Sequence, residues 1–402
     1  MRISTSMIYD MGVAGIQKQT SDLLKTNMQV ASGRRILTPK DDPVGAARVL
    51  EVSQAKSLNQ QYDVNTDSTS SALSLEETAL DAVNNLLLDV RTSVIDAGGP
   101  LMDQTKLAGL ATSLRGRYQE LLGLANSTDG NGQYMFSGYK GAVQPFTQTS
   151  PGNVTYNGDQ GQRLIQVSPS RQIAASDAGS DVFQQIKSGN GIFVTAAAAT
   201  NTGTGLLTPG SVVTAYDGND YQVDFTVAAG VTTYTVTNLT TSVIGPSTPY
   251  VSGNAIPVGG GQFTVSGAPA NGDSFTLNPS SNEDIFKTLN NLITALETPT
   301  DPITPAEHTT LLNNLTTAIS NLDNGRNQVL KVQASIGTRM QEVEAIKVSG
   351  MDVALQYDMT LSDLQDLDYA KGITDLTRYQ TGLEAAQKSF LKIQGLSLFN
   401  YM

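Results

Sequence analysis

The side chains that most often carry out catalysis are scarce in this sequence. It has no cysteine and one histidine, His308, so cysteine nucleophiles, Ser-His-Asp triads and the common zinc sites are hard to build from it. Asp217, Asn219 and Asp220 have the residue types of a calcium loop, but the distal glutamate of an EF-hand is absent and Asp-Gly-Asn is ordinary turn chemistry. We therefore predict that the protein is not an enzyme and has no catalytic, cofactor-binding or metal-binding residue.

One charged stretch, SGRRILTPKDDPVGAA at residues 32–47, is informative in another way. Gly33 suits the left-handed conformation that ends a helix, and Asp42 followed by Pro43 is typical of a helix start. We predict that two helices meet here at a hinge whose arginines and aspartates form a solvated charged cluster. The residues assigned to this hinge are Ser32, Gly33, Arg34, Arg35, Ile36, Asp41, Asp42 and Pro43.

The composition limits the remaining classes of function. Lys and Arg number 25 against 37 Asp and Glu, for a net charge of −12, which argues against a nucleic-acid-binding surface. The absence of cysteine excludes disulfides, and no apolar run is long enough to span a bilayer. At 402 residues, the chain is expected to form more than one domain.

Apolar residues recur at seven-residue intervals in both end regions of the chain, which predicts long helices packed as a bundle or coiled coil. In the body of the two regions these residues are Leu73, Leu80, Leu87 and Val94, then Leu315, Leu322, Val329, Ile336 and Val343. At the extreme ends, the residues assigned to a terminal coiled coil are Ile16, Leu23, Val30, Leu376, Leu383 and Phe390.

The middle of the chain, from about residue 134 to 282, has a different texture. Thr, Val and Tyr alternate there with period two between glycine turns, as in GNDYQVDFTVAAGVTTYTVTNLTTSV. This pattern predicts a β-rich domain inserted into a helical one. The aromatic residues Tyr216, Tyr221, Phe225 and Tyr234 are interpreted as its core rather than as the lining of a site.

The predicted fold is therefore α+β and multidomain, with a helical bundle and coiled coil formed by both chain ends. We divide it into a coiled-coil segment with the hinge (1–42), a helical body with a β-hairpin region (43–180), an inserted variable β-rich domain (181–282), the return of the body (283–358) and a second coiled-coil segment (359–402).

The hinge stretch resembles the N-terminal signature of the bacterial flagellin superfamily, Ser-Gly-x-Arg-Ile followed by an Asp-Asp pair. The form Asp-Asp-Pro-Val and the ending AAQKSFLKIQGLSLFNYM are similar to the hook-associated protein 3 branch, whereas flagellins usually close with a Val-Leu-Ser-Leu-Leu type of run. Residues 131–146, 156–171 and 272–293 are also similar to that branch. Residues from about 191 to 270 match none of its motifs.

The resemblance implies a structural adaptor of the bacterial flagellum, exported from the cytoplasm by the flagellar type III apparatus. Such an adaptor is extracellular and forms a ring at the hook–filament junction, where it is required for filament attachment and motility. Its implied partners are further copies of itself, the hook-end protein (hook-associated protein 1), flagellin and an export chaperone, with no nucleic acid and no membrane insertion. The hinge then serves assembly, the terminal coiled coil forms the inner core of the assembled structure, and the chaperone-binding candidates are Leu376, Leu383, Phe390 and Ile393.

Two alternatives stay open at this point. One is a flagellin-type subunit of the filament itself, against which the C-terminal ending argues. The other is an adhesin or glycan-binding role of the central β domain, in which its strand aromatics would line a site.

Overall fold

The computed structural model describes residues 5–99, 102–150 and 152–395. The helices are α1 (Thr5–Ser32), α2 (Pro43–Ala97), α3 (Gln104–Ala125), α4 (Gly179–Phe183), α5 (Ile285–Glu297), α6 (Pro305–Gln365) and α7 (Tyr369–Gly395). The strands are β1 (Phe146–Ser150), β2 (Asn153–Tyr156), β3 (Leu164–Ser168), β4 (Arg171–Ala174), β5 (Ile186–Lys187), β6 (Phe193–Ala197), β7 (Leu206–Leu207), β8 (Ser211–Val212), β9 (Tyr221–Ala228), β10 (Val231–Asn238), β11 (Val243–Ile244), β12 (Thr248–Pro249), β13 (Ala255–Val258), β14 (Gly261–Ser266), β15 (Ser274–Pro279) and β16 (Asn282–Glu283).

The described residues fall into two compact units. The terminal unit comprises those up to Val64 together with those from Ala345 onward, and the central unit runs from Asn65 to Glu344. The division lies inside α2 and α6, so each of these helices contributes to both units.

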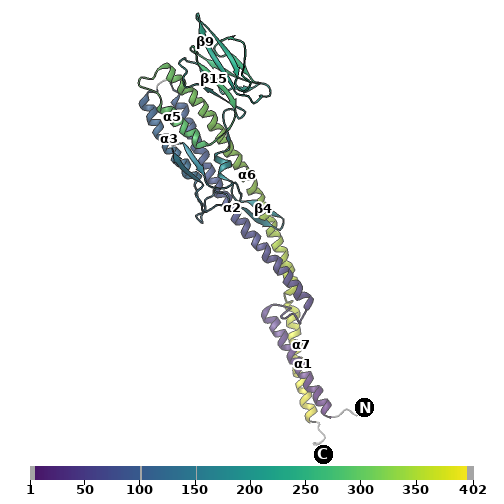
Figure 1. The fold of residues 1–402 in the computed structure, drawn as a ribbon. Coiled ribbons are helices and arrows are strands. Elements are labelled where there is room, and N and C mark those ends of the chain that lie inside the picture. The colour runs from purple at the N-terminus through teal and green to yellow at the C-terminus, as the bar shows by residue number, and fades with distance from the viewer. Residues whose placement is uncertain (1–4, 100–101, 151, 396–402) are drawn as a thin grey trace, which may run out of the picture. The chain divides into compact units, whose positions relative to one another are not determined.

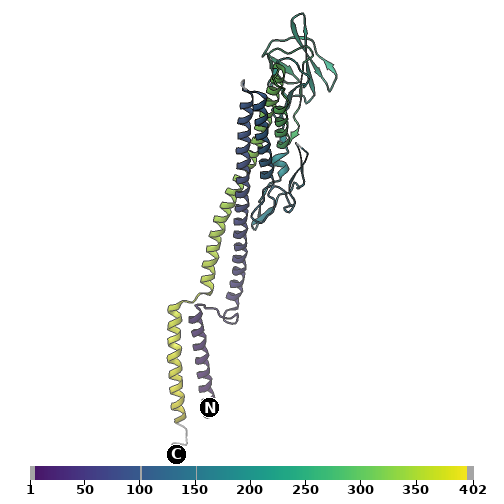
Figure 2. The ribbon, with the colours of Figure 1, turned by 90° about the vertical axis from the view of Figure 1, so that its left-hand side faces the viewer.

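In the terminal unit, α1 and α7 lie antiparallel and side by side (Figures 1 and 2). At one end of the pair, the rings of Tyr9 and Phe390 are 5.1 Å apart between centroids. Gly12 lies so near Phe390 that a Cβ there would be 2.8 Å from the ring, so its lack of a side chain allows this close approach. The start of α2 meets the end of α6 through an ion pair between Lys56 and Asp358.

The bundle of the central unit is built on α2 and α6, with α3 and α5 packed together beside them (Figure 2). The heptad residues predicted from the sequence form its core, since each of them between Leu73 and Val94 and between Leu315 and Val343 is at most 3% exposed. Polar pairs along the same two helices include Arg91 with Asp323, at 2.8 Å. The predicted pairing of the two chain regions is therefore confirmed.

Local signals in the sequence set where these helices begin. The Asp103 carboxylate accepts a hydrogen bond from the Lys106 amide at 2.9 Å and so caps α3. At the start of α6, the Glu307 amide donates to Thr304 Oγ1 at 3.2 Å while the Glu307 carboxylate accepts from the Thr304 amide at 2.9 Å. This reciprocal arrangement is a capping box, and Pro305 occupies the first helical position after it.

Short hairpins lie against the bundle within the central unit. β1 pairs with β2 and β3 with β4, each antiparallel, and β5 pairs with β16 where the chain leaves and re-enters the body. The Phe146 ring contacts the rings of Tyr156, Phe183 and Phe286 at centroid distances of 5.1–5.5 Å. This aromatic cluster joins the hairpin region to α4 and α5.

The inserted β domain consists of two antiparallel sheets. One has the order β11-β10-β9-β15-β6 with β12 also on β10, and the other the order β13-β14-β7 with β8 also on β14. Phe225 and Tyr221 are buried in its core, and Tyr216 and Tyr234 pack against that core. The interpretation of these aromatics as core residues is confirmed, and with it the predicted α+β fold.

Among the described residues, no helix combines the length and the apolar character needed to cross a membrane.

Candidate assembly site at two helical breaks

Two breaks in the helices lie together within the terminal unit. One separates α1 from α2 at residues 33–42, and the other separates α6 from α7 at residues 366–368. The Leu367 amide donates to the Gly33 carbonyl at 2.8 Å, and the Arg35 amide donates to the Gln365 carbonyl at 2.7 Å. Arg34 and Asp366 face each other in an isolated antiparallel bridge, so the two breaks form one short two-stranded connection.

Gly33 makes the first break possible. Its φ of 70° lies in the left-handed region that residues with a Cβ rarely adopt. A Cβ at this position would also lie 2.9 Å from the Tyr369 hydroxyl, at the start of α7. The conformation predicted for Gly33 from the sequence is therefore the observed one.

Arg35 ties the two breaks together through its side chain. One guanidinium nitrogen, Nη2, donates to the Leu364 carbonyl at the end of α6 at 2.7 Å, and Nη1 lies 3.4 Å from Asp42 Oδ2. The neighbouring Arg34 side chain is exposed and forms no hydrogen bond or ion pair with any residue that the structure describes. The two arginines, which the sequence placed in one charged cluster, therefore differ in their contacts.

The two aspartates of the motif also have different partners. Asp41 pairs with Lys25 of α1 at 2.7 Å and accepts from the Thr38 amide at 2.9 Å. The hydrogen bond from Lys25 and the one from Thr38 stabilise the carboxylate and lower the pKa of Asp41 to about 2. Asp42 Oδ1 accepts from the Gly45 amide at 2.8 Å, which caps α2 directly before Pro43.

The remaining residues of the hinge motif, Ile36 and Ser32, also make contacts at the first break. Ile36 is half-buried, and its side chain lies against Gly45, where a Cβ would come within 2.8 Å of it. The Ser32 hydroxyl is the acceptor for the Arg34 amide at 3.3 Å.

The predicted coiled-coil residues all lie in α1 or α7, and each is half-buried: Ile16, Leu23, Val30, Leu376, Leu383 and Phe390. The fourth chaperone-binding candidate, Ile393, belongs to α7, but its side chain lies outside the described residues. That these side chains bind a chaperone stays a prediction.

The terminal unit also exposes apolar side chains on the outward side of its helices. If Ile16 is taken as heptad position a, Met7 and Met28 occupy f, Met11 occupies c and Leu24 occupies b. A two-helix coiled coil turns these positions toward solvent and usually fills them with polar residues. If Val343 on α6 is likewise taken as position a and the heptad is continued, another set of exposed apolar residues falls at positions f, b, f and c: Val348, Met351, Leu355 and Met359. We call these two sets the outer stripes: Met7, Met11, Leu24 and Met28 on α1, and Val348, Met351, Leu355 and Met359 on α6, all of them exposed.

The stripe on α1 borders an open groove next to the first break. The groove has a volume of about 850 Å³ and is lined by Leu24, Met28, Leu37 and the paired Lys25 and Asp41, among others. An apolar floor beside a fixed ion pair is a surface suited to another helix.

Sequence reasoning missed the second break. Asp368 Oδ1 accepts from the Ala370 amide at 3.0 Å and from the Lys371 amide at 3.2 Å, which caps α7. An aspartate before a periodic apolar run is the usual signal for a helix start, so this break was detectable. Its pairing with residues 33–35 was not, because nothing local connects them.

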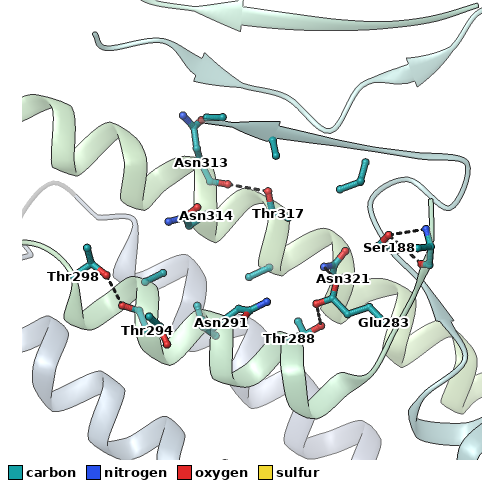
Figure 3. A pocket seen from close by; sticks show the side chains of 17 residues that line it. Ser188, Glu283, Thr288, Asn291, Thr294, Thr298, Asn313, Asn314, Thr317 and Asn321 are labelled. Atoms are coloured by element: carbon teal, nitrogen blue, oxygen red, sulfur yellow. Dashed lines mark hydrogen bonds between the residues drawn. The ribbon is translucent and has the colours of Figure 1, made fainter. Parts of the chain in front are cut away.

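A polar cavity of about 430 Å³ lies in the central unit between β6, α5 and α6 (Figure 3). Its asparagines serve the fold: Asn321 Oδ1 accepts from the buried Gly189 amide at 2.8 Å, and Asn313 Oδ1 accepts from the Leu207 amide at 2.8 Å. Glu283 accepts from Thr288 Oγ1 at 3.0 Å and Asn321 Nδ2 at 3.3 Å. The bonds from Gly189 and Leu207 attach the inserted domain to α6. In the described part of the chain, no group of three or more His, Asp or Glu side chains could hold a metal ion.

Comparisons with known proteins agree with this architecture. Residues 3–141 match the model of the bacterial flagellin N-terminal helical region. The chain is 27% identical over 399 residues to flagellar hook-associated protein 3 of Salmonella typhimurium, and the match covers 99% of each chain. It is 30% identical to flagellar hook associated protein-3 of Legionella pneumophila, whose crystal structure it matches with a TM-score of 0.74, over 79% of this chain and 98% of that one. The chain belongs to the flagellar hook-associated protein 3 family.

A further crystal structure, the flagellar junction protein FlgL of Legionella pneumophila, is 30% identical with a TM-score of 0.71, over 79% of this chain and all of that one. The resemblance seen in the sequence is thereby confirmed. As a member of the hook-associated protein 3 family, the chain is a structural, non-enzymatic protein of the extracellular flagellum, at the hook–filament junction, and its partners are flagellar.

Arg35→Ala is expected to reduce filament attachment and swimming while changing the free energy of unfolding by less than ~1 kcal/mol, because Arg35 is half-exposed and exposed ion pairs contribute little. Soft-agar swimming and thermal unfolding of the purified chain measure the two effects. Arg34→Ala is the matched control, and it should swim normally. Equal swimming by the two variants would show that the contacts of Arg35 do not serve assembly.

Proposed function

We propose that the chain assembles as a ring of subunits between the hook-end protein (hook-associated protein 1) and the first flagellin subunits of the filament. The outer stripes support this proposal. They place large apolar side chains where a finished two-helix coiled coil has polar ones, and each terminal helix pair gains stability if those side chains are covered by helices of neighbouring subunits.

The paired breaks fit the same role. They join α1 to α2 and α6 to α7 through a few backbone hydrogen bonds, the side chain of Arg35 and the ion pair between Asp41 and Lys25. Such a connection fixes the path of the chain while leaving the angle between successive helices open to adjustment. An adaptor between two different tubes needs this freedom, since its neighbours on the two sides are not identical.

The experiment compares a strain from which the gene is deleted with the same strain carrying the gene on a plasmid. We expect the deletion strain to build hooks, release flagellin into the medium and fail to swim, and we expect the plasmid to restore filaments. Normal filaments in the deletion strain would overturn the proposed role, and hooks missing from that strain would place the chain earlier in assembly.

We further propose that an export chaperone binds the C-terminal helix before the chain leaves the cytoplasm through the flagellar type III apparatus. Leu376, Leu383 and Phe390 recur at seven-residue intervals on α7 and form an apolar stripe suited to a helix-in-groove contact. Leu383→Asp with Phe390→Asp is expected to abolish binding in a pull-down from cytoplasm while the main thermal transition is unchanged. Unchanged binding would remove this stripe as the chaperone site.

The glycan-binding alternative loses its basis in the structure. Two of the aromatic side chains that would line such a site, Tyr221 and Phe225, are buried in the core of the β domain and are not available to a sugar.

A further inference from the structure

The outer stripes are rich in methionine. Met7, Met11, Met28, Met351 and Met359 are 48–66% exposed, and all five belong to the terminal unit. In the central unit, Met135 is only 6% exposed. The chain has neither cysteine nor tryptophan, so the thioether sulfur of methionine is its most easily oxidised side-chain group.

We propose that these five methionines are a site of oxidative modification by hydrogen peroxide and related two-electron oxidants, and that their oxidation blocks assembly of the chain. In this step the thioether sulfur attacks the peroxide, the O–O bond breaks and an S–O bond forms. Sulfur loses two electrons, peroxide is reduced to water, and each methionine becomes methionine sulfoxide.

The consequence follows from where the sulfur atoms lie. A sulfoxide is polar and accepts hydrogen bonds, so it disrupts an apolar contact that a flexible thioether would fill. At positions b, c and f of α1, it would convert the outward apolar stripe into a polar one and leave the seam with α7 untouched. Oxidation therefore removes the assembly surface without unfolding the chain. This inference rests on the proposed function, since it assumes that neighbouring subunits cover the outer stripes.

Two multiple variants test it in the deletion strain. In the first, all five methionines are replaced by leucine, which keeps the stripes apolar and resists oxidation. In the second, all five are replaced by glutamine, which imitates the polarity of the sulfoxide. We expect the leucine variant to assemble because its stripes stay apolar, and its regrowth without peroxide serves as its own baseline. The glutamine variant is expected to restore few filaments while keeping the same thermal transition.

The decisive measurement is filament regrowth after shearing, in cells treated with sublethal hydrogen peroxide. Peroxide is expected to reduce regrowth several-fold more in cells with the unaltered chain than in cells with the leucine variant. Peptide mass spectrometry of the purified chain should find sulfoxide at the five positions well before Met135. Equal loss of regrowth in both strains, or oxidation that does not favour the five positions, would overturn the inference and leave the proposed function standing. If the unaltered chain does not restore filaments even without peroxide, the proposed function itself fails.

Discussion

Leu23→Asp is expected to abolish filament attachment and swimming while the main thermal transition of the purified chain stays where it is. Leu23 is half-buried on α1 and lies on the heptad stripe of the α1 and α7 pair. An ionised carboxylate placed in that seam loses part of its hydration without gaining a partner, which costs on the order of several kcal/mol. The central unit has its own core between Asn65 and Glu344 and should not sense the change.

Asn27→Asp is the matched control because it introduces the same negative charge at an exposed position of α1. We expect this variant to swim nearly as well as the unaltered chain. Leu23 lies outside the chaperone-binding candidates, so export of Leu23→Asp into the medium should continue. If the secreted variant still attaches filaments, the seam between α1 and α7 is not needed in the assembled junction. A lowered thermal transition would instead show that the terminal helices stabilise the whole chain.

Local sequence patterns determine some parts of this protein, and the structure shows which ones. The heptads of α2 and α6 predicted the bundle correctly, since residues such as Leu80 and Val329 are fully buried. Helix-terminal chemistry predicted the first break equally well, because Gly33 and Asp42 act within a few residues of their own position. Both kinds of signal depend on neighbours along the chain.

What the sequence did not reveal depends on partners distant in the chain. Arg35 donates to the carbonyl of Leu364, 329 positions away, and a backbone acceptor leaves no trace in the residue type. Asp41 was grouped with the arginines beside it, yet its salt bridge is with Lys25 on the preceding helix. The outer stripes were not predicted, although the heptad that places Ile16 at position a also fixes which residues occupy b, c and f.

The second large effect is expected in the central unit, at the buried carboxyl of Glu76 on α2. One oxygen of this side chain accepts a hydrogen bond from the Asp177 amide at 2.9 Å. The other oxygen is buried and has no hydrogen-bond partner among the described residues. Asp177 lies beside it and forms an ion pair with Arg339 of α6, and Arg163 also acts on Glu76. Glu76 thus shares a buried site with a second carboxylate.

Burial, followed by repulsion from Asp177, raises the pKa of Glu76 from its ordinary value of 4.5 to about 8, although the Asp177 amide and the two arginines act in the opposite direction. The folded chain therefore keeps this proton at pH values where the unfolded chain has lost it. A state that binds more protons is favoured at lower pH, so the contribution of Glu76 to stability is fully present below pH 4.5 and is lost as the pH rises through the folded pKa.

Glu76→Gln is accordingly expected to make the central unit more stable than the unaltered chain at alkaline pH and about equally stable near pH 5. The amide is neutral at every pH and similar in shape to the protonated acid, so the variant avoids ionisation of a buried group. Each pKa unit of the shift is equivalent to about 1.4 kcal/mol, which makes the difference measurable by urea unfolding across this pH range.

Glu77→Gln, at the less buried neighbouring position, is the control and should keep the pH dependence of the unaltered chain. Because Asp284 also has a raised pKa and is present in all three proteins, its contribution cancels in the comparison. If Glu76→Gln and the unaltered chain lose stability in parallel as the pH rises, Glu76 is already ionised in the fold, and its unpartnered oxygen must then be stabilised by Arg163 and Arg339.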